Sequence, residues 1–313
     1  MVYEAKGMLA LYDVGLAEVW DPVVTDLLNS EAVFYGQTPQ IPAQSLSWNK
    51  AVRYGRNAQV GPILSTDNIL GDSTTKIELN HKLKQYRAAV TIEDARVLEA
   101  QKNGIGMLKD AWASEFELTV KDLAYDVNTA LFADEQSEGF GTVTANEMDG
   151  LRGLLKTAGT IYGQARSSYA LLAANVDTST TTFSFSAFRA WLTELKTAGG
   201  KNFVVYTTYS ILDIVRNAME NNKLYMGVSA QAGFEGAITI DGIPLIADKD
   251  CPDDHIFILD RDAYYMQVFT PFTLGSTKPI AKVNLTETMY IVGRMDLVFE
   301  RFNTSYKITG ITA

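Results

Sequence analysis

One short stretch of the chain concentrates the residue types that carry out chemistry in proteins. Residues 241–260 read DGIPLIADKDCPDDHIFILD and contain the only cysteine and one of the two histidines. Carboxylates in a loop can hold a calcium or magnesium ion, and a bound metal can activate water. The side chains that could take part are Asp248, Asp250, Cys251, Asp253, Asp254 and His255, with Asp248, Asp250 and Asp253 as the candidate ligands of a hard cation. One hypothesis is therefore a metal-dependent hydrolase.

The same stretch also fits a turn between two strands. The apolar runs at 243–248 and 256–260 predict buried strands, and Pro252 lies among acidic residues between them. Aspartate side chains accept hydrogen bonds from nearby backbone amides and proline fixes φ, so this composition is typical of an exposed turn. We favour the turn, and we expect no catalytic, cofactor-binding or metal-binding residues in it.

The rest of the chain lacks catalytic signatures. It contains no Gly-x-Ser-x-Gly, no phosphate-binding loop ending in Gly-Lys-Ser/Thr, no His-Glu-x-x-His and no Cys-x-x-Cys. The second histidine, His81, falls on one face of an alternating stretch, which is typical of a packed histidine. We therefore expect a protein that is not an enzyme and needs no cofactor.

The composition indicates an acidic globular protein. Apolar residues make up 47% of the chain and charged residues 20%, enough for a substantial core. The 27 Lys and Arg against 37 Asp and Glu give a formal net charge of −10, which disfavours a broad grip on nucleic-acid phosphates. One cysteine allows no internal disulfide, and neither a signal peptide nor a membrane-spanning run is found. We expect a soluble protein made in a reducing cytoplasm.

Residues 46–92 predict a long antiparallel ribbon. The segment TKIELNHKL (75–83) alternates strictly, LSWNKAVRYGRNAQV (46–60) is a second plausible strand, and GPILSTDNILGDS (61–73) supplies turn formers. About 15 residues a side would make a ribbon roughly 50 Å long. A lone ribbon is only marginally stable in water, and no neighbouring segment is an obvious third strand. Another subunit is therefore the expected support.

Helices and strands then alternate. Thr91 with Asp94 predicts a helix start, and the apolar spacing from Trp112 to Leu131 predicts a long helix from Met107. Ser186 is a candidate N-cap for the next helix. The further expected elements are a strand at 202–208, a helix at 210–222, the strands at 243–248 and 256–260, and a tail at 287–311 that forms one long strand or two paired ones. The alternation indicates a compact α/β unit within an α+β chain.

This order of parts resembles the major capsid protein of tailed bacteriophages and related viruses, the Hong Kong ninety-seven fold. The resemblance covers nearly the whole chain, and DGIPLIADKDCPDDHIFILD is its most specific piece; MDGLRGLL (148–155) and TTYSILDIVRNAMEN (207–221) also resemble family segments. It implies an N-terminal arm at 1–45, an extended hairpin loop at 46–92, a peripheral domain with its spine helix at 93–150, an axial domain at 151–276 and a return to the peripheral domain at 277–313.

The resemblance also implies a function. The chain would self-assemble as hexamers and pentamers into an icosahedral shell, the capsid of a virion, around double-stranded DNA that it binds without sequence specificity. Assembly would take place in the host cytoplasm with separate scaffolding, portal and decoration proteins, and without a membrane. Some family members crosslink a lysine to an asparagine, but Lys76 and Asn80 lie on a predicted strand and not at a loop tip.

Two alternatives stay open at this point. An encapsulin-type nanocompartment resembles the same fold and encloses a cargo enzyme instead of a genome. The metal-dependent hydrolase using the acidic turn at 248–255 belongs to a different class, and it would be a small oligomer that loses activity with a chelator.

Overall fold

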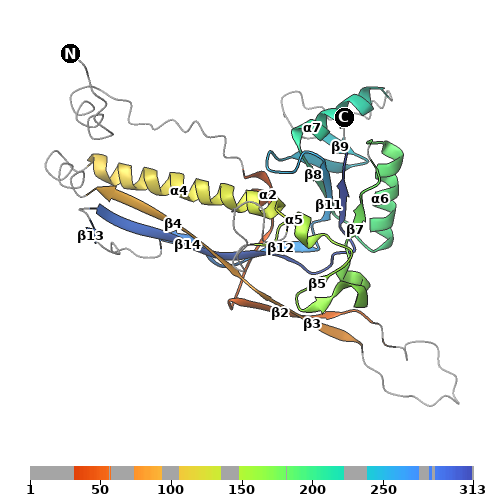
Figure 1. The fold of residues 1–313 in the computed structure, drawn as a ribbon, viewed down its shortest axis with the longest axis horizontal. Coiled ribbons are helices and arrows are strands. Elements are labelled where there is room, and N and C mark those ends of the chain that lie inside the picture. Colours follow the sequence, from red (N-terminus) through yellow and green to blue (C-terminus); the bar gives the residue numbers. More distant parts are fainter. Residues whose placement is uncertain are drawn as a thin grey trace.

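The computed structural model describes residues 32–55, 57, 74–93, 106–134, 148–180, 182–221, 238–274, 282–283 and 286–311. This part of the chain forms two main sheets, a long helix and a two-stranded ribbon (Figure 1). None of its described helices is long and apolar enough to cross a bilayer. The fold is α+β, as the sequence predicts.

The first sheet has five strands and is built around β14. Strand β14 pairs antiparallel with β4, β12 and β13, and the short β1 joins the outer edge of β12 in parallel. The strands are β1 (Gln40–Pro42), β4 (Lys84–Glu93), β12 (Tyr264–Leu274), β13 (Lys282–Val283) and β14 (Thr286–Phe299).

The long helix α4 (Gly106–Phe132) packs along one face of this sheet (Figure 1). Its apolar residues recur every three or four positions, so Leu123, Val127 and Leu131 lie on one side and are buried. They share a core with Tyr86 and Val90 of β4. Arg87 and Ala89 of β4 point to the opposite, exposed face, because side chains alternate along a strand.

The second sheet has six strands in the order β7-β15-β11-β8-β10-β9. Two helices, α6 (Phe185–Thr197) and α7 (Tyr209–Asn221), pack with residues of one face of this sheet in a single cluster. The strands are β7 (Asn175–Asp177), β8 (Phe203–Thr207), β9 (Ile238–Ile240), β10 (Ile243–Ala247), β11 (His255–Asp260) and β15 (Tyr306–Thr309).

The two sheets share one core. Every residue of β8 and β11 is buried, which explains why these strands are continuous apolar runs and do not alternate with polar residues. Val205 and Ile258 face the helices α6 and α7, whereas Tyr206 and Phe257 belong to the cluster formed by α4 and the five-stranded sheet.

Smaller elements connect these parts. Among them β5 and β6 form a two-residue hairpin, and the pair β2–β3 forms a separate two-stranded sheet. The elements are α2 (Val33–Gln37), β2 (Ser47–Arg53), β3 (Lys76–Lys82), α5 (Leu151–Leu154), β5 (Thr160–Ile161), β6 (Gln164–Ala165) and the short 3-10 helices Arg166–Ser168 and Ala170–Leu172.

Several sequence predictions are confirmed. The long helix, the strand at 202–208, the helix at 210–222 and the strands at 243–248 and 256–260 correspond to α4, β8, α7, β10 and β11. Their signals are local, either a sustained helical period or an uninterrupted apolar run, so the chain folds there as its own pattern dictates.

Two helix starts are predicted wrongly. Thr91 begins no helix, because it lies in β4 opposite Thr288. The N-cap of α6 is Ser184 and not Ser186, since the Ser184 hydroxyl accepts a hydrogen bond from the Ala187 amide at 3.2 Å. Thr91 pairs with β14 and does not cap a helix. Helix α6 begins two residues earlier than predicted, because Ser184 provides the cap.

Three boundaries differ from the predicted division of the chain. Strand β4 is not part of a free ribbon at 46–92, because ten of its residues pair with β14 of the same chain. Strand β12 lies in the five-stranded sheet, although it starts well before residue 276. Strand β15 returns to the six-stranded sheet, so the tail at 287–311 forms two strands that do not pair with each other.

Candidate functional site

The acidic stretch forms a buried polar network around Asp248. Asp248 follows β10 and is fully buried. Its Oδ2 accepts hydrogen bonds from the Phe34 amide at 3.0 Å and from Asn128 Nδ2 at 3.1 Å, and its Oδ1 accepts from the Asp250 amide at 2.9 Å. Asn128 in turn accepts from the Tyr35 amide at 3.0 Å. We name this set the Asp248 network.

The Asp248 network joins the short helix α2 to the six-stranded sheet and to α4. The first amides of a helix have no partner within it, and the N-cap residue of α2, Ala32, has no side chain to provide one. Asp248 from the six-stranded sheet and Asn128 from α4 supply the acceptors. The ring of Phe34 then packs among rings of β8, α4 and β12, 4.7 Å from Tyr206, 5.3 Å from Phe132 and 5.9 Å from Tyr264.

The interpretation of this stretch as an exposed turn is therefore correct for only part of it. Asp253 is exposed, but Asp250 accepts a 2.6 Å hydrogen bond from Asn128, and His255 is buried beside Asp254 at 2.5 Å. Burial raises the pKa of Asp250 and lowers the pKa of His255.

The geometry does not assemble the predicted ligands around a common point. The oxygens of Asp248 face amide donors of the protein itself. Burial, together with the neighbouring Asp248, raises the pKa of the Cys251 thiol well above its ordinary value, and a thiolate is the form that binds metals. Among the described residues, no three His, Cys, Asp or Glu side chains are arranged to hold a metal ion.

A second polar centre lies where the ribbon meets the five-stranded sheet. Trp48 donates a hydrogen bond from Nε1 to the Tyr265 hydroxyl at 3.0 Å, and Lys50 forms an ion pair with Glu300. Leu79 is fully buried in the same core. The part of β2 and β3 that makes these contacts consists of Trp48–Lys50 and Leu79–His81, and we call it the ribbon base.

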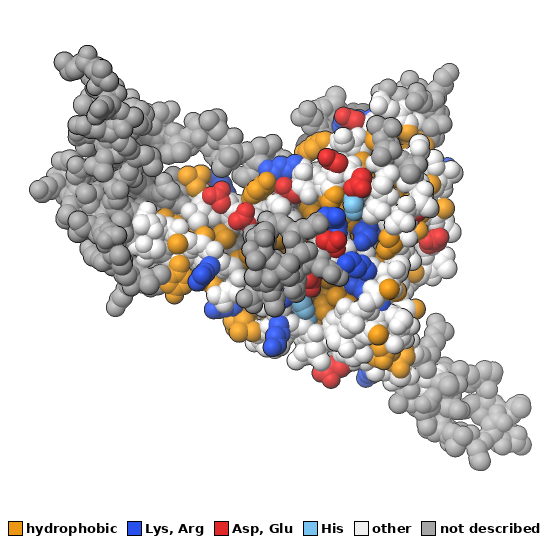
Figure 2. Space-filling model, viewed as in Figure 1, with side chains coloured by type: hydrophobic (Ala, Val, Ile, Leu, Met, Phe, Trp, Pro, Cys, Tyr) orange, Lys and Arg blue, Asp and Glu red, His pale blue; other side chains and the backbone are white. Residues whose placement is uncertain are grey.

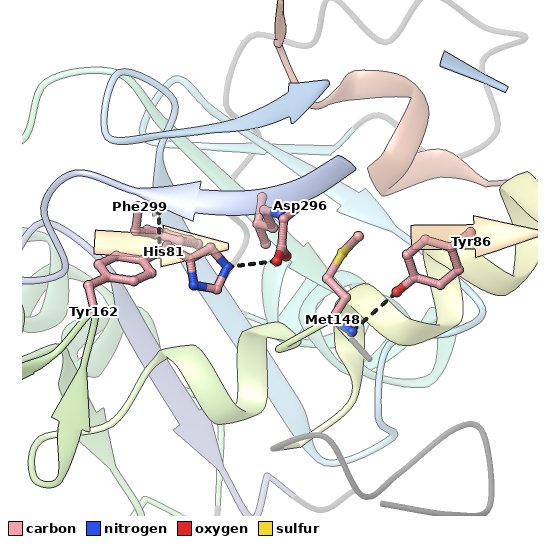
Figure 3. Close-up of polar contacts among 7 residues, drawn as sticks. His81, Tyr86, Met148, Tyr162, Asp296 and Phe299 are labelled. Carbon is pink, nitrogen blue, oxygen red and sulfur yellow. Dashed lines mark hydrogen bonds and ion pairs between the residues drawn. The ribbon is translucent and has the colours of Figure 1, made fainter. Parts of the chain in front are cut away.

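His81 makes the central contact of the ribbon base. Its Nε2 lies 2.6 Å from Oδ2 of Asp296 on β14, which is a fully buried carboxylate (Figure 3). Burial raises the pKa of Asp296, while the hydrogen bond from His81 and the attraction of Lys84 oppose that rise. A polar pocket of about 440 Å³ opens beside His81, with Lys82, Lys84 and Asp149 in its lining.

Tyr162 supports His81 from the other side. Its ring lies 5.1 Å from His81 and 5.3 Å from Trp48, and its hydroxyl accepts a hydrogen bond from the Phe299 amide at 3.1 Å (Figure 3). Tyr162 and Gly163 form the turn of the β5–β6 hairpin, both with positive φ, at 50° and 79°. This conformation is unfavourable for tyrosine, and the ring contacts hold it in place.

The ribbon base corrects the prediction that the whole ribbon lacks support in its own subunit. Trp48, Ile77 and Leu79 are buried in the core of the same chain. The predicted tip at 61–73 lies outside the described residues, so its placement on a neighbour stays a prediction.

Sequence reasoning missed four residues that matter most in these two centres: Phe34, Asn128, Tyr162 and Asp296. Asn128 and Asp248 are 120 residues apart, and His81 and Asp296 are 215 residues apart, so no local spacing connects them. The Tyr-Gly dipeptide at 162–163 was the one available local signal, since glycine in a two-residue turn is typical of a hairpin.

Basic and acidic side chains are interspersed over the middle of the face drawn in Figure 2. This arrangement agrees with the net charge of −10, which disfavours broad electrostatic binding to nucleic-acid phosphates.

Comparison with known proteins supplies the family. The model of the SU10 major capsid protein family matches residues 88–312 of the chain, well over half of its length. The chain belongs to the SU10 major capsid protein family. No curated protein sequence matches it.

Solved structures agree on the fold of this capsid protein. A chain of the cyanophage A-1(L) capsid asymmetric unit is 15% identical, with a TM-score of 0.68, and covers 94% of this chain and 97% of its own. A chain from the capsid of a native GTA particle is 12% identical, with a TM-score of 0.69 and 94% of each chain covered. A chain of the holo-SrpI encapsulin complex from Synechococcus elongatus PCC 7942 is 10% identical, with a TM-score of 0.65, and covers 96% of this chain and 95% of its own.

These findings confirm the resemblance to the Hong Kong ninety-seven fold. This capsid protein is a structural protein of a viral shell, and its family and fold are not those of an enzyme. The hydrolase hypothesis for the acidic turn is therefore wrong, and the Asp248 network is a structural joint.

Proposed function

We propose that this capsid protein assembles as hexamers and pentamers into an icosahedral shell around double-stranded DNA. Assembly would take place in the host cytoplasm with separate scaffolding, portal and decoration proteins. The similar chains come from capsids, among them that of a GTA particle, which supports assembly of this chain with copies of itself. Closed symmetry multiplies modest contacts between copies into a stable container.

The observation that carries this proposal is the separate ribbon. Strands β2 and β3 pair only with each other and lie outside both main sheets (Figure 1). Seven residue pairs connect them, from Ser47–Lys82 to Arg53–Lys76. A two-stranded sheet is only marginally stable in water by itself. The segment that follows Arg53 would therefore gain stability from contact with another copy of the chain.

Replacing residues 61–73 with an Asn-Gly turn tests this proposal. The subunit should stay folded, because its described core lies in the ribbon base and the two sheets. Loss of about 1.4 kcal/mol per contact lowers each pairwise association constant about tenfold. We expect unchanged circular dichroism and a shift from closed particles to free capsomers or monomers in light scattering.

A Gly/Ser segment of the same length is the matched variant, because it removes the tip side chains without shortening the loop. It should assemble as poorly as the Asn-Gly variant. Loss of secondary structure would show that the tip belongs to the fold of its own subunit. Shells that form at the wild-type protein concentration would show that the tip makes no contact between subunits.

The encapsulin-type compartment is the second candidate, and the fold is compatible with both. The family match favours the virus, because the matching family consists of major capsid proteins. Mass spectrometry of purified particles separates the two: packaging and portal proteins accompany a viral shell, whereas a single cargo protein accompanies a compartment.

A further inference from the structure

Lys307 is a buried cation of the six-stranded sheet. It lies on β15 opposite Phe257 of β11, so its side chain points to the face of the sheet away from α6 and α7. Only 9% of Lys307 is exposed. Its Nζ donates a hydrogen bond to the carbonyl oxygen of Arg152 at 2.8 Å, and among the described residues it forms no other hydrogen bond and no ion pair. Because an ammonium group has three protons to donate, Lys307 can bind a further acceptor.

The charges around Lys307 are mostly positive. Arg152 on α5, Lys156 two residues beyond α5 and Arg166 on the first 3-10 helix all act on it, and of the described carboxylates Asp134 opposes them. An oxygen of Asp134 lies 3.3 Å from Lys156 Nζ, so this carboxylate already balances one of the cations. Burial lowers the pKa of Lys307 to about 8; Asp134 opposes this change, and the three cations add to it. A buried ammonium group among like charges is stabilised by an anion.

Solvent reaches the edge of this group of cations. Arg152 and Lys156 are partly exposed, and Figure 2 shows basic side chains, with acidic ones among them, at the surface near α5 and β7. Arg166 is buried, and its guanidinium donates to the carbonyl oxygens of Leu154 and Leu172 at 2.6 Å each. It therefore contributes a fixed charge, whereas the other three side chains can contact a ligand. We call Arg152, Lys156 and Lys307 the Lys307 cluster.

We propose that the Lys307 cluster binds a phosphate group. A phosphate group presents three acceptor oxygens, so it can meet donors that come from β15, from α5 and from the segment after α5 at once. A guanidinium binds two of these oxygens side by side, and an ammonium group acts as a point charge.

Free phosphate and the phosphates of a DNA backbone share this chemistry, and the DNA backbone as the source rests on the proposed function. A backbone contact carries no sequence information, which agrees with a shell that encloses DNA without sequence specificity. The cluster is local, so it is compatible with a net charge of −10 that disfavours broad binding to nucleic acid.

Titration calorimetry of the unassembled subunit with inorganic phosphate, at constant ionic strength, tests the proposal. We expect Lys307→Gln to weaken phosphate binding at least about tenfold, because it removes a charged donor. Lys156→Gln should weaken it several-fold. Lys121→Gln is the matched control: Lys121 Nζ also lies 3.3 Å from a carboxylate oxygen, that of Glu117, and this variant should bind phosphate as wild type does.

The pH dependence of sulfate binding gives a second readout, because sulfate keeps its charge between pH 7 and pH 9. Lys307, with a pKa of about 8, changes from mostly protonated to mostly neutral over this range. Since the anion binds the protonated form, the sulfate affinity of wild type should fall about tenfold, and that of Lys307→Gln should stay constant.

The other charged groups around Lys307 are of types whose ordinary pKa values lie below about 7 or above about 10. They are Asp134, Arg152, Lys156, Arg166, Asp254 and His255. Burial lowers the pKa of His255 still further from this range. A change in affinity between pH 7 and pH 9 therefore reports on Lys307.

A short DNA duplex distinguishes the two sources of the phosphate group. If backbone phosphates reach the Lys307 cluster, the duplex will displace inorganic phosphate, and Lys307→Gln will weaken duplex binding as well. If the cluster binds only free phosphate, the duplex will leave the phosphate affinity unchanged. Either result supports the site. Thermal melting checks the folding of each variant, and Lys156→Gln, at a partly exposed position, replaces Lys307→Gln in the comparison if the latter unfolds.

Four results would overturn the proposal: no phosphate binding by wild type, equal phosphate affinity of the Lys307→Gln and Lys121→Gln variants, a sulfate affinity of wild type that does not change with pH, or equal affinity for acetate and phosphate. Binding is measured on the unassembled subunit and shell formation is measured separately. If wild type forms shells but binds no phosphate, the proposed function stands and only the phosphate site is wrong.

Discussion

Replacing Asp248 with alanine will lower the free energy of unfolding of the unassembled subunit by about 3 kcal/mol or more. The change removes the acceptor of the Phe34 and Asp250 amides and of the Asn128 side chain. A buried donor without a partner costs about 1–3 kcal/mol. The loss should appear as a lower midpoint in urea, followed by circular dichroism.

Asp253→Ala is the matched control, because Asp253 is an exposed carboxylate in the same turn. Surface changes of this kind usually stay within about 0.5 kcal/mol. In a double-mutant cycle, Asn128→Ala should cost much less when Asp248 is already alanine. Equal stability of the Asp248 and Asp253 variants would contradict the assignment of the turn as a joint between the six-stranded sheet, α4 and α2.

Replacing His81 with alanine will have a comparable effect on the ribbon base. It leaves the buried carboxylate of Asp296 without its side-chain partner, and breaking a buried pair in this way costs about 3–5 kcal/mol. The double variant His81→Leu with Asp296→Leu should be more stable than His81→Ala, because it leaves no buried charge.

The pH dependence of the His81→Ala variant gives a second readout. Burial already raises the pKa of Asp296, and removing the hydrogen bond from His81 removes a cause that lowers it. A carboxyl group with a raised pKa binds protons more readily in the folded state than in the unfolded state, so its protonation favours folding. The variant should regain stability as the pH falls toward about 4, the ordinary range of a carboxyl group. A loss relative to wild type that stays constant from neutral to acidic pH would contradict this role of Asp296.

The parts of the fold that the sequence predicts are those with a local signal. Strands β8, β10 and β11 are apolar runs, and α4 shows a helical stripe from Phe116 to Leu131, so each pattern identifies its element without knowledge of the partner. The same reasoning fails for β4. It is predicted as part of the ribbon at 46–92, but its partner β14 is about 200 residues away, and no local pattern carries information on which strand it will meet.

The two polar centres could not be predicted for the same reason. Each joins residues from distant parts of the chain, such as Asn128 with Asp248, and buried polar groups must find hydrogen-bond partners wherever the fold brings them. The composition of the acidic stretch is unusual and indicates it from the sequence alone. Its chemistry is determined by burial, which converts a candidate metal ligand, Asp248, into an acceptor for backbone and side-chain amides.

The most direct test of the account is a negative-stain image of the expressed wild-type protein, with light scattering over a series of protein concentrations. We expect rings or closed shells larger than a tetramer, with or without a scaffolding protein. A monodisperse monomer at high protein concentration under both conditions would contradict the claim that this chain builds a shell through contacts between its own copies.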